Sequence, residues 1–412
     1  MIFTIFTLLT NETVYKMIKL NKTALLLAGV CLFGINSYAQ KLTKSQNDEL
    51  LKAGQGAIVR LDGFLTEKTA SIAYQKYPTP GPQYIISDDP EYIRVPEAIA
   101  LKESVVPGSV RFYLYNVNGV VEPKKIDRKI IAMIKNTGKA PMRIKMLKYV
   151  TQKPSTNYFK LGKEGLAAFL AAQPSEEVRI VKPGEAVPID EKLEQYVVKY
   201  DELVHGFYEF LVDQPAEITV LQTDLKTSGK DALKRITNVL PPKTKSGAGR
   251  GLYGVSNYHI NNMSVIDTKN GTSALVVADG ASDPWIIGRE GTTGQMAKLA
   301  GNYGVMYDIE LKWKSTDGKG LALITWNSRS ADNKWCSGMA AAMKVSGGKF
   351  NEGIIQLPKD ELVTKAAPEA VLIQVFKPTG NGEEQTIKLT YSPPGASCLP
   401  TPLIFVPVDL KP

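Results

Sequence analysis

Apolar and polar residues alternate with the period of a β-strand along most of the chain after residue 57. The clearest case is residues 109–116, where Val110, Phe112 and Leu114 alternate with more polar side chains. Successive side chains on a strand point to opposite faces, so this pattern predicts a half-buried strand. Further runs of this kind, separated by turns that contain Gly or Pro, occur at 57–61, 71–74, 83–86, 129–134, 142–147, 177–181, 187–189, 205–212 and 216–221.

Two local features stand out within this first series of strands. Residues 135–139 (Lys-Asn-Thr-Gly-Lys) lie between two strand-like runs and predict a tight hairpin connection. Residues 162–173 are rich in Leu and Ala and end before Pro174, so they predict one short helix.

The chain divides at 241–251, where Pro241 and Pro242 are followed by basic residues and Gly247-Ala-Gly249, a composition typical of a linker. Strand-like runs resume beyond it, at 262–266, 273–277, 303–313, 320–326, 341–345, 370–376 and 386–391. We therefore expect a mostly β protein with two tandem antiparallel β-sandwich domains of the immunoglobulin-like type, 40–240 and 252–412, with the helix in the first.

The N-terminal segment predicts export. Lys19 and Lys22 precede an apolar core at 23–35, and a small-x-Ala site ends at Ala39, which is the plan of a secretory signal peptide over 17–39. Residues 1–16 are interpreted as an upstream extension. The apolar core is shorter than the ~20 residues that span a bilayer, so no transmembrane segment is expected in the mature chain. The predicted location is the periplasm, the outer surface or the extracellular medium.

Charge and cysteine content narrow the function classes. The net charge of +9 is spread along the chain without a block of five or six like charges, so nothing indicates a nucleic-acid partner. After removal of the signal peptide two cysteines remain, Cys336 and Cys398. An isolated pair in an oxidising compartment predicts a disulfide, and two free thiols are the alternative.

All four tryptophans lie in the C-terminal half, and two of them sit beside loop residues. Flat aromatic rings exposed on a β-sandwich are a common binding surface, which makes Trp285 and Trp335 candidate ligand-binding residues. The alternative is ordinary core packing.

A loop in the same half carries a candidate metal site. Asp279 and Asp283 flank Gly280 and offer carboxylate oxygens of the kind that Ca²⁺ binds, although Asp and Gly also make ordinary turns. No cofactor motif is present in the sequence. The two histidines, His205 and His259, have no ligand-spaced partner and are interpreted as structural.

No residue pattern predicts catalysis. The Gly254-Val-Ser256 run does not complete a nucleophile elbow. Paired carboxylates for glycoside cleavage could be drawn from Asp308, Glu310 or Asp332, but any sandwich offers such pairs by chance.

The chain resembles a family of exported bacterial surface proteins with two successive β-rich modules, some of which stand beside copper-amine-oxidase N-terminal-like modules. The residues that carry the likeness are 157–166 through Pro174, the turn 182–184, and 301–307. The resemblance implies a surface or envelope location, and it carries no catalytic residues over to this chain.

The sequence thus predicts an exported, non-catalytic envelope or surface protein with a structural or binding role. A carbohydrate-binding protein is the first alternative, and a secreted hydrolase acting on polysaccharide is the second. The expected partner is an envelope glycan or a surface protein, and no oligomeric state is predicted.

Overall fold

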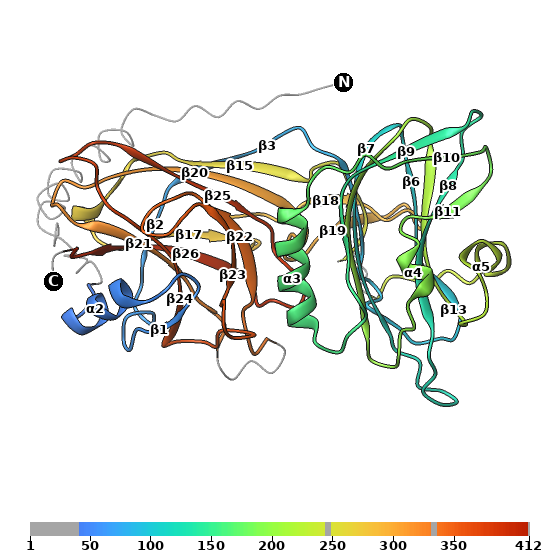
Figure 1. Ribbon diagram of the computed structural model, residues 1–412, viewed down its shortest axis with the longest axis horizontal. Coiled ribbons are helices and arrows are strands. Elements are labelled where there is room, and N and C mark those ends of the chain that lie inside the picture. Colours follow the sequence, from blue (N-terminus) through green and yellow to red (C-terminus); the bar gives the residue numbers. More distant parts are fainter. Residues whose placement is uncertain (1–40, 244–248, 331–335, 411–412) are drawn as a thin grey trace, which may run out of the picture. The chain divides into compact units, whose positions relative to one another are not determined.

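β-strands dominate the computed structural model, which describes residues 41–243, 249–330 and 336–410 (Figure 1). The mostly β prediction is confirmed. The predicted signal peptide 17–39, the upstream residues, the linker residues 244–248 and Trp335 lie outside the described residues. The segment Gln40–Pro412 forms one compact unit.

Two sheets enclose the first hydrophobic core, and together they are called the first sandwich. The large sheet has the order β10 (Val178–Val181), β9 (Met142–Thr151), β12 (Leu203–Val212), β7 (Gly108–Asn118), β4 (Gln83–Ser87), β14 (Arg250–Tyr253), β18 (Ile287–Arg289) and β19 (Met296–Lys298), with β5 (Tyr92–Ile93) also beside β7. The small sheet has the order β11 (Ala186–Pro188), β8 (Lys129–Asn136), β13 (Ala216–Thr223) and β6 (Ala98–Val105). Phe112, Ile131 and Val220 are among the buried side chains that pack between them.

Two further sheets form the second sandwich. One has the order β1 (Ile58–Arg60), β24 (Glu369–Phe376), β21 (Gly320–Thr325), β26 (Thr401–Val408), β17 (Ser273–Val277) and β2 (Ala70–Ser71). The other has the order β23 (Gly353–Leu357), β22 (Ala341–Val345), β25 (Gln385–Tyr391), β20 (Met306–Lys314), β15 (Asn257–Asn262) and β3 (Tyr74–Pro78), with β16 (Ile266–Asp267) also beside β20. Trp313, Leu323 and Phe405 belong to the core between them.

The expected pair of tandem antiparallel immunoglobulin-like domains is not confirmed. Three of the four sheets contain parallel neighbours, for example β4 with β7, β15 with β20 and β17 with β2. Strand pairing also crosses the predicted boundary at 241–251. Strands β1 and β3 come from the first segment but pair with β24 and β15 of the second, while β14 and β18 extend the large sheet.

The predicted helix is present as α3 (Tyr158–Ala171), and it begins four residues earlier than expected. The side chain of Asn157 caps its N-terminus by accepting a hydrogen bond from Lys160 N at 3.1 Å. Figure 1 shows α3 between the two groups of sheets, and it contacts β9 and β12 on one side and β22 and β23 on the other. The other helices of the described residues are α2 (Lys44–Lys52), α4 (Lys192–Gln195), α5 (Gly229–Arg235) and the 3₁₀ turn η1 (Thr268–Asn270).

The hairpin prediction at 135–139 is wrong. Strands β8 and β9 flank this turn, but β8 pairs with β11 and β13 in the small sheet and β9 pairs with β10 and β12 in the large sheet. The Asn136 side chain donates to Ala140 O at 2.8 Å and to Val181 O at 2.9 Å, so it ties the turn to the end of β10. The turn therefore carries the chain from one sheet to the other.

The predicted disulfide is confirmed. Cys336 and Cys398 are bonded, with a Cα–Cα distance of 5.4 Å, and they close a loop across 62 positions of sequence. Within the described ranges, no helix combines the length and the apolar character needed to cross a membrane.

Candidate functional site

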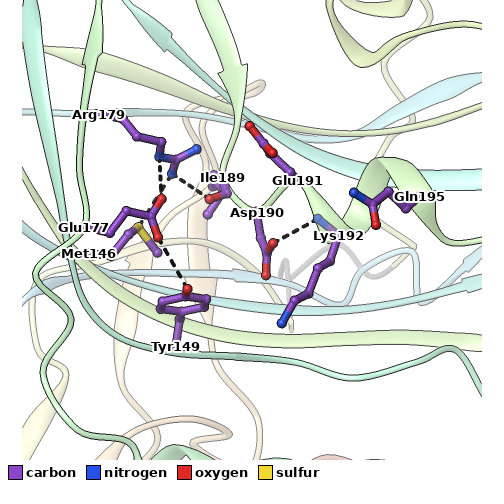
Figure 2. Close-up of a pocket in the computed structure, with 9 residues that line it drawn as sticks. All are labelled: Met146, Tyr149, Glu177, Arg179, Ile189, Asp190, Glu191, Lys192 and Gln195. Atoms are coloured by element: carbon purple, nitrogen blue, oxygen red, sulfur yellow. Dashed lines mark hydrogen bonds and ion pairs between the residues drawn. The ribbon is translucent and has the colours of Figure 1, made fainter.

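A pocket of about 300 Å³ opens at the edge of the large sheet, where residues of β9, β10 and the segment after β11 line it (Figure 2). We call it the tyrosine–carboxylate pocket. It is lined by Met146, Tyr149, Glu177, Arg179, Ile189, Asp190, Glu191, Lys192 and Gln195.

Arg179 forms the wall of the pocket. Arg179 pairs in register with the buried Ile144, so its side chain points to the inner face of the sheet. The guanidinium donates to Pro188 O and Ile189 O, each at 2.7 Å, and its Nε lies 3.2 Å from Glu177 Oε1. These contacts hold β10 against the chain that leaves the small sheet.

Tyr149 lies at the base of the view in Figure 2, with its hydroxyl directed at Glu177. The Tyr149 hydroxyl donates to Glu177 Oε2 at 3.4 Å. Partial burial and the nearby Glu177 and Asp190 carboxylates raise the pKa of Tyr149. The phenol is therefore protonated at neutral pH and acts as a hydrogen-bond donor.

Asp190 is held in place from two sides. Its carboxylate accepts hydrogen bonds from the Thr151 hydroxyl and from Lys192 N, the latter at 2.9 Å. The Thr151 hydroxyl also lies 2.8 Å from the hydroxyl of the buried Tyr208. Because a backbone amide and the Thr151 hydroxyl, itself tied to the buried Tyr208, orient Asp190, its carboxylate is pre-ordered before any ligand arrives.

The rim of the pocket is polar and accessible. The side chains of Glu191, Lys192 and Gln195 are exposed there. Together with Glu177 and Asp190 they line one pocket with carboxylate acceptors, an ammonium group and an amide. None of the nine lining residues is a Ser, Cys or His, so the lining itself supplies no nucleophile of those types.

The predicted aromatic residues lie elsewhere. Trp285 is half-buried, and the Lys298 Nζ lies 5.2 Å from the centre of its ring. Gly280 packs against the same indole, since a Cβ added there would stand 2.6 Å from Trp285 Cε2. Trp285 does not line the tyrosine–carboxylate pocket, and Trp335 lies outside the described residues. Ligand binding by these two residues stays a prediction.

The carboxylates of the predicted calcium loop already have partners. Asp283 is fully buried and accepts hydrogen bonds from the Lys76 ammonium and from the Tyr307 hydroxyl, the latter at 2.8 Å. Asp279 accepts from three backbone amides of its own loop, Ala281, Ser282 and Asp283. Burial raises the pKa of Asp279, but these amide bonds outweigh burial and lower it. In the described ranges, no three His, Cys, Asp or Glu side chains are grouped so as to hold a metal.

The described histidines and acidic residues of the hydrolase alternative do not line the tyrosine–carboxylate pocket. His205 is buried with its ring edge on Tyr113 at 5.1 Å, and burial lowers its pKa to about 3. His259 Nδ1 lies 3.5 Å from Asp308 Oδ2, and Glu310 pairs with Lys388 at 3.4 Å. Asp332 lies outside the described residues.

Comparison with known proteins gives no family assignment. No family model matches the chain, and no curated protein matches it. Among solved structures, the CUB1-EGF-CUB2 region of human MASP-1/3 aligns over 81% of this chain and 99% of that one, with 9% identity and a TM-score of 0.18. Procruciferin, an 11S globulin from Brassica napus, aligns over 87% of this chain and 86% of its own, with 8% identity and a TM-score of 0.15. Likenesses at this level carry no argument about function.

Proposed function

We propose that this protein is an exported envelope or surface protein that acts by binding, and that its ligand is a hydroxyl-rich molecule of the glycan class. The observation that carries the proposal is the tyrosine–carboxylate pocket, where the ring of Tyr149 stands beside the oriented carboxylates of Glu177 and Asp190.

The chemistry of the pocket matches that of a sugar. A pyranose has an apolar face that packs on an aromatic ring, and it has hydroxyl groups that donate to carboxylates and accept from amides and ammonium groups. Small-molecule sites are concave and present a few well-placed polar groups, as this pocket does. Pre-ordering of Asp190 by Thr151 and of Glu177 by Arg179 lowers the entropy lost on binding.

Export is supported by two features of the chain. Residues 17–39 follow the plan of a signal peptide. The Cys336–Cys398 disulfide suits an oxidising compartment, where such bonds persist. An envelope location would bring the pocket into contact with glycans.

Titration calorimetry with solubilised peptidoglycan fragments and surface polysaccharide tests the proposal. We expect Tyr149→Ala to weaken binding about tenfold, corresponding to roughly 1.4 kcal/mol for the lost ring contact. Glu177→Gln should weaken binding as well, whereas Tyr77→Ala, at a tyrosine 45% exposed outside the pocket, should leave it unchanged.

The other outcomes separate the alternatives. Loss of glycan binding on Trp285→Ala but not on Tyr149→Ala would move the site to the indole predicted from the sequence. Release of reducing ends from the polysaccharide would show a hydrolase instead. Absence of binding to every envelope glycan would refute the glycan proposal.

A further inference from the structure

The hairpin β18–β19 presents four exposed side chains on one face. Ile287 is paired in register with Lys298, and Arg289 is paired with Met296. Cross-strand partners share a face of the sheet, so the apolar and cationic side chains alternate along both strands. Ile287 is 58% exposed and Met296 is 65% exposed, which places both among the most exposed large hydrophobic residues of the described chain. We call this surface the hairpin face.

The hairpin face is open because the two sheets of the first sandwich differ in width. The small sheet ends at β6, which contacts β4 and β14 of the large sheet. The large sheet continues beyond β14 through β18 to β19. The half-buried Leu252 on β14 packs against the core between the sheets, and the next two strands extend past that core.

The opposite face of the hairpin is packed, which makes the exposed face rigid. Ala297 is fully buried and belongs to the hydrophobic core of the second sandwich. Gly288 lies so close to β14 that an added Cβ would stand 2.3 Å from Leu252 O. The hairpin therefore displays Ile287 and Met296 from a fixed platform and not from a loose loop.

The charge of the hairpin face is positive. Neither Arg289 nor Lys298 forms an ion pair with a described carboxylate, and the Lys298 ammonium instead lies over the Trp285 ring. Two carboxyl groups beside the hairpin, Glu103 and Glu290, are buried. Glu290 forms an ion pair with Arg250 at 2.9 Å. Burial raises the pKa of Glu103, and the positive charge of Arg289 partly opposes that rise.

We propose that the hairpin face docks on an anionic lipid surface. Ile287 and Met296 would enter the boundary between head groups and acyl chains, and Arg289 and Lys298 would contact lipid phosphates. Trp285 lies beside Lys298, and tryptophan is enriched at this depth of a membrane. A soluble acidic polymer would satisfy the two cations but would leave both apolar side chains in water. The lipid surface accounts for both kinds of residue.

Sedimentation of the purified protein with lipid vesicles tests this inference. One set of vesicles contains phosphatidylcholine alone, and the other contains about one third phosphatidylglycerol. We expect binding to the anionic vesicles only, with a roughly tenfold weaker partition for Ile287→Ser/Met296→Ser. Arg289→Gln/Lys298→Gln should abolish the preference for the anionic lipid.

The matched control is Val106→Ser/Met263→Ser, which removes two side chains of 63% and 64% exposure outside the hairpin. It should bind as the unchanged protein does, and circular dichroism verifies that every variant is folded. Absence of binding to anionic vesicles, equal binding to neutral vesicles, or an equal loss in the control would overturn the inference. The glycan titration is independent of this result, because the tyrosine–carboxylate pocket shares no residue with the hairpin face.

Discussion

Glu103 is a buried carboxyl group whose charge opposes folding, and Glu103→Gln should stabilise the protein at alkaline pH. The side chain is 1% exposed, Oε1 accepts a hydrogen bond from Gly291 N at 2.6 Å, and Oε2 has no partner among the described residues. Burial raises the pKa of Glu103 to about 7, and Glu290 adds to the rise, while the Gly291 amide, Arg289 and Arg250 oppose it.

The sign of the pH dependence follows from this raised pKa. Between its ordinary value of 4.5 and about 7 the folded protein holds a proton on Glu103 that the unfolded chain releases. The stability that this group contributes is therefore complete below pH 4.5 and is lost as the pH rises through about 7. The difference between the two pKa values corresponds to roughly 3 kcal/mol as an upper bound.

Glutamine keeps the oxygen that accepts from Gly291 N and stays neutral at every pH. Urea denaturation between pH 4.5 and 8.5 should show equal stability of the two proteins at the acid end. At pH 8.5 the variant should be more stable by about 1–3 kcal/mol. The control is Glu67→Gln at an exposed carboxylate, whose stability should track the unchanged protein throughout. The reasoning about this carboxyl group is refuted if the free energy of unfolding of Glu103→Gln changes with pH as that of the unchanged protein does. It is also refuted if the variant is the less stable protein at pH 8.5.

Two further predictions concern stability. Reduction of Cys336–Cys398, or replacement of both cysteines by serine, should lower the free energy of unfolding by about 4 kcal/mol, because the bond closes a loop across 62 positions and so restricts the unfolded chain. An unchanged melting temperature in reductant would contradict this. Gly162→Ala in α3 should lower the melting temperature although alanine favours helices, because the new Cβ would stand 2.2 Å from Gly395 O. A higher melting temperature would show that the backbone at Gly395 moves to make room for the methyl group.

The sequence predicted where strands lie better than it predicted which of their faces are buried. Alternation at 109–116 indicated a strand buried on one face, yet β7 is buried on both. The polar-looking face carries Tyr113, whose hydroxyl accepts from Gly395 N at 2.9 Å, and Arg111, which donates to Ser256 O at 2.7 Å. These partners lie more than 140 positions away along the chain, so local periodicity could not reveal that the second sandwich covers this face.

The candidate site was missed for a similar reason. Tyr149 and Arg179 occupy ordinary strand positions, and Asp190 lies in a short connection, so none of them forms a motif. Only the contact between β10 and the segment after β11 brings Arg179 to the Pro188 and Ile189 carbonyls. The disulfide was predictable because the predicted mature chain leaves one possible pair. Helix α3 was predictable from its Leu- and Ala-rich run and from Pro174, whereas its start at Tyr158 was missed because the Asn157 cap was not recognised.

The exchange of strands between the two segments constrains the order in which the chain can fold. Among the described strands β1 pairs with β24 alone, more than 300 residues later, and β3 pairs with β15 across the intervening strands β4 to β14. Pairings of such long sequence separation are slow to form, because loop closure costs entropy before any contact repays it. During synthesis β1 can therefore pair with β24, and β3 with β15, only once those later strands have been made. A protein cut at 241–251 would leave both halves with open sheet edges.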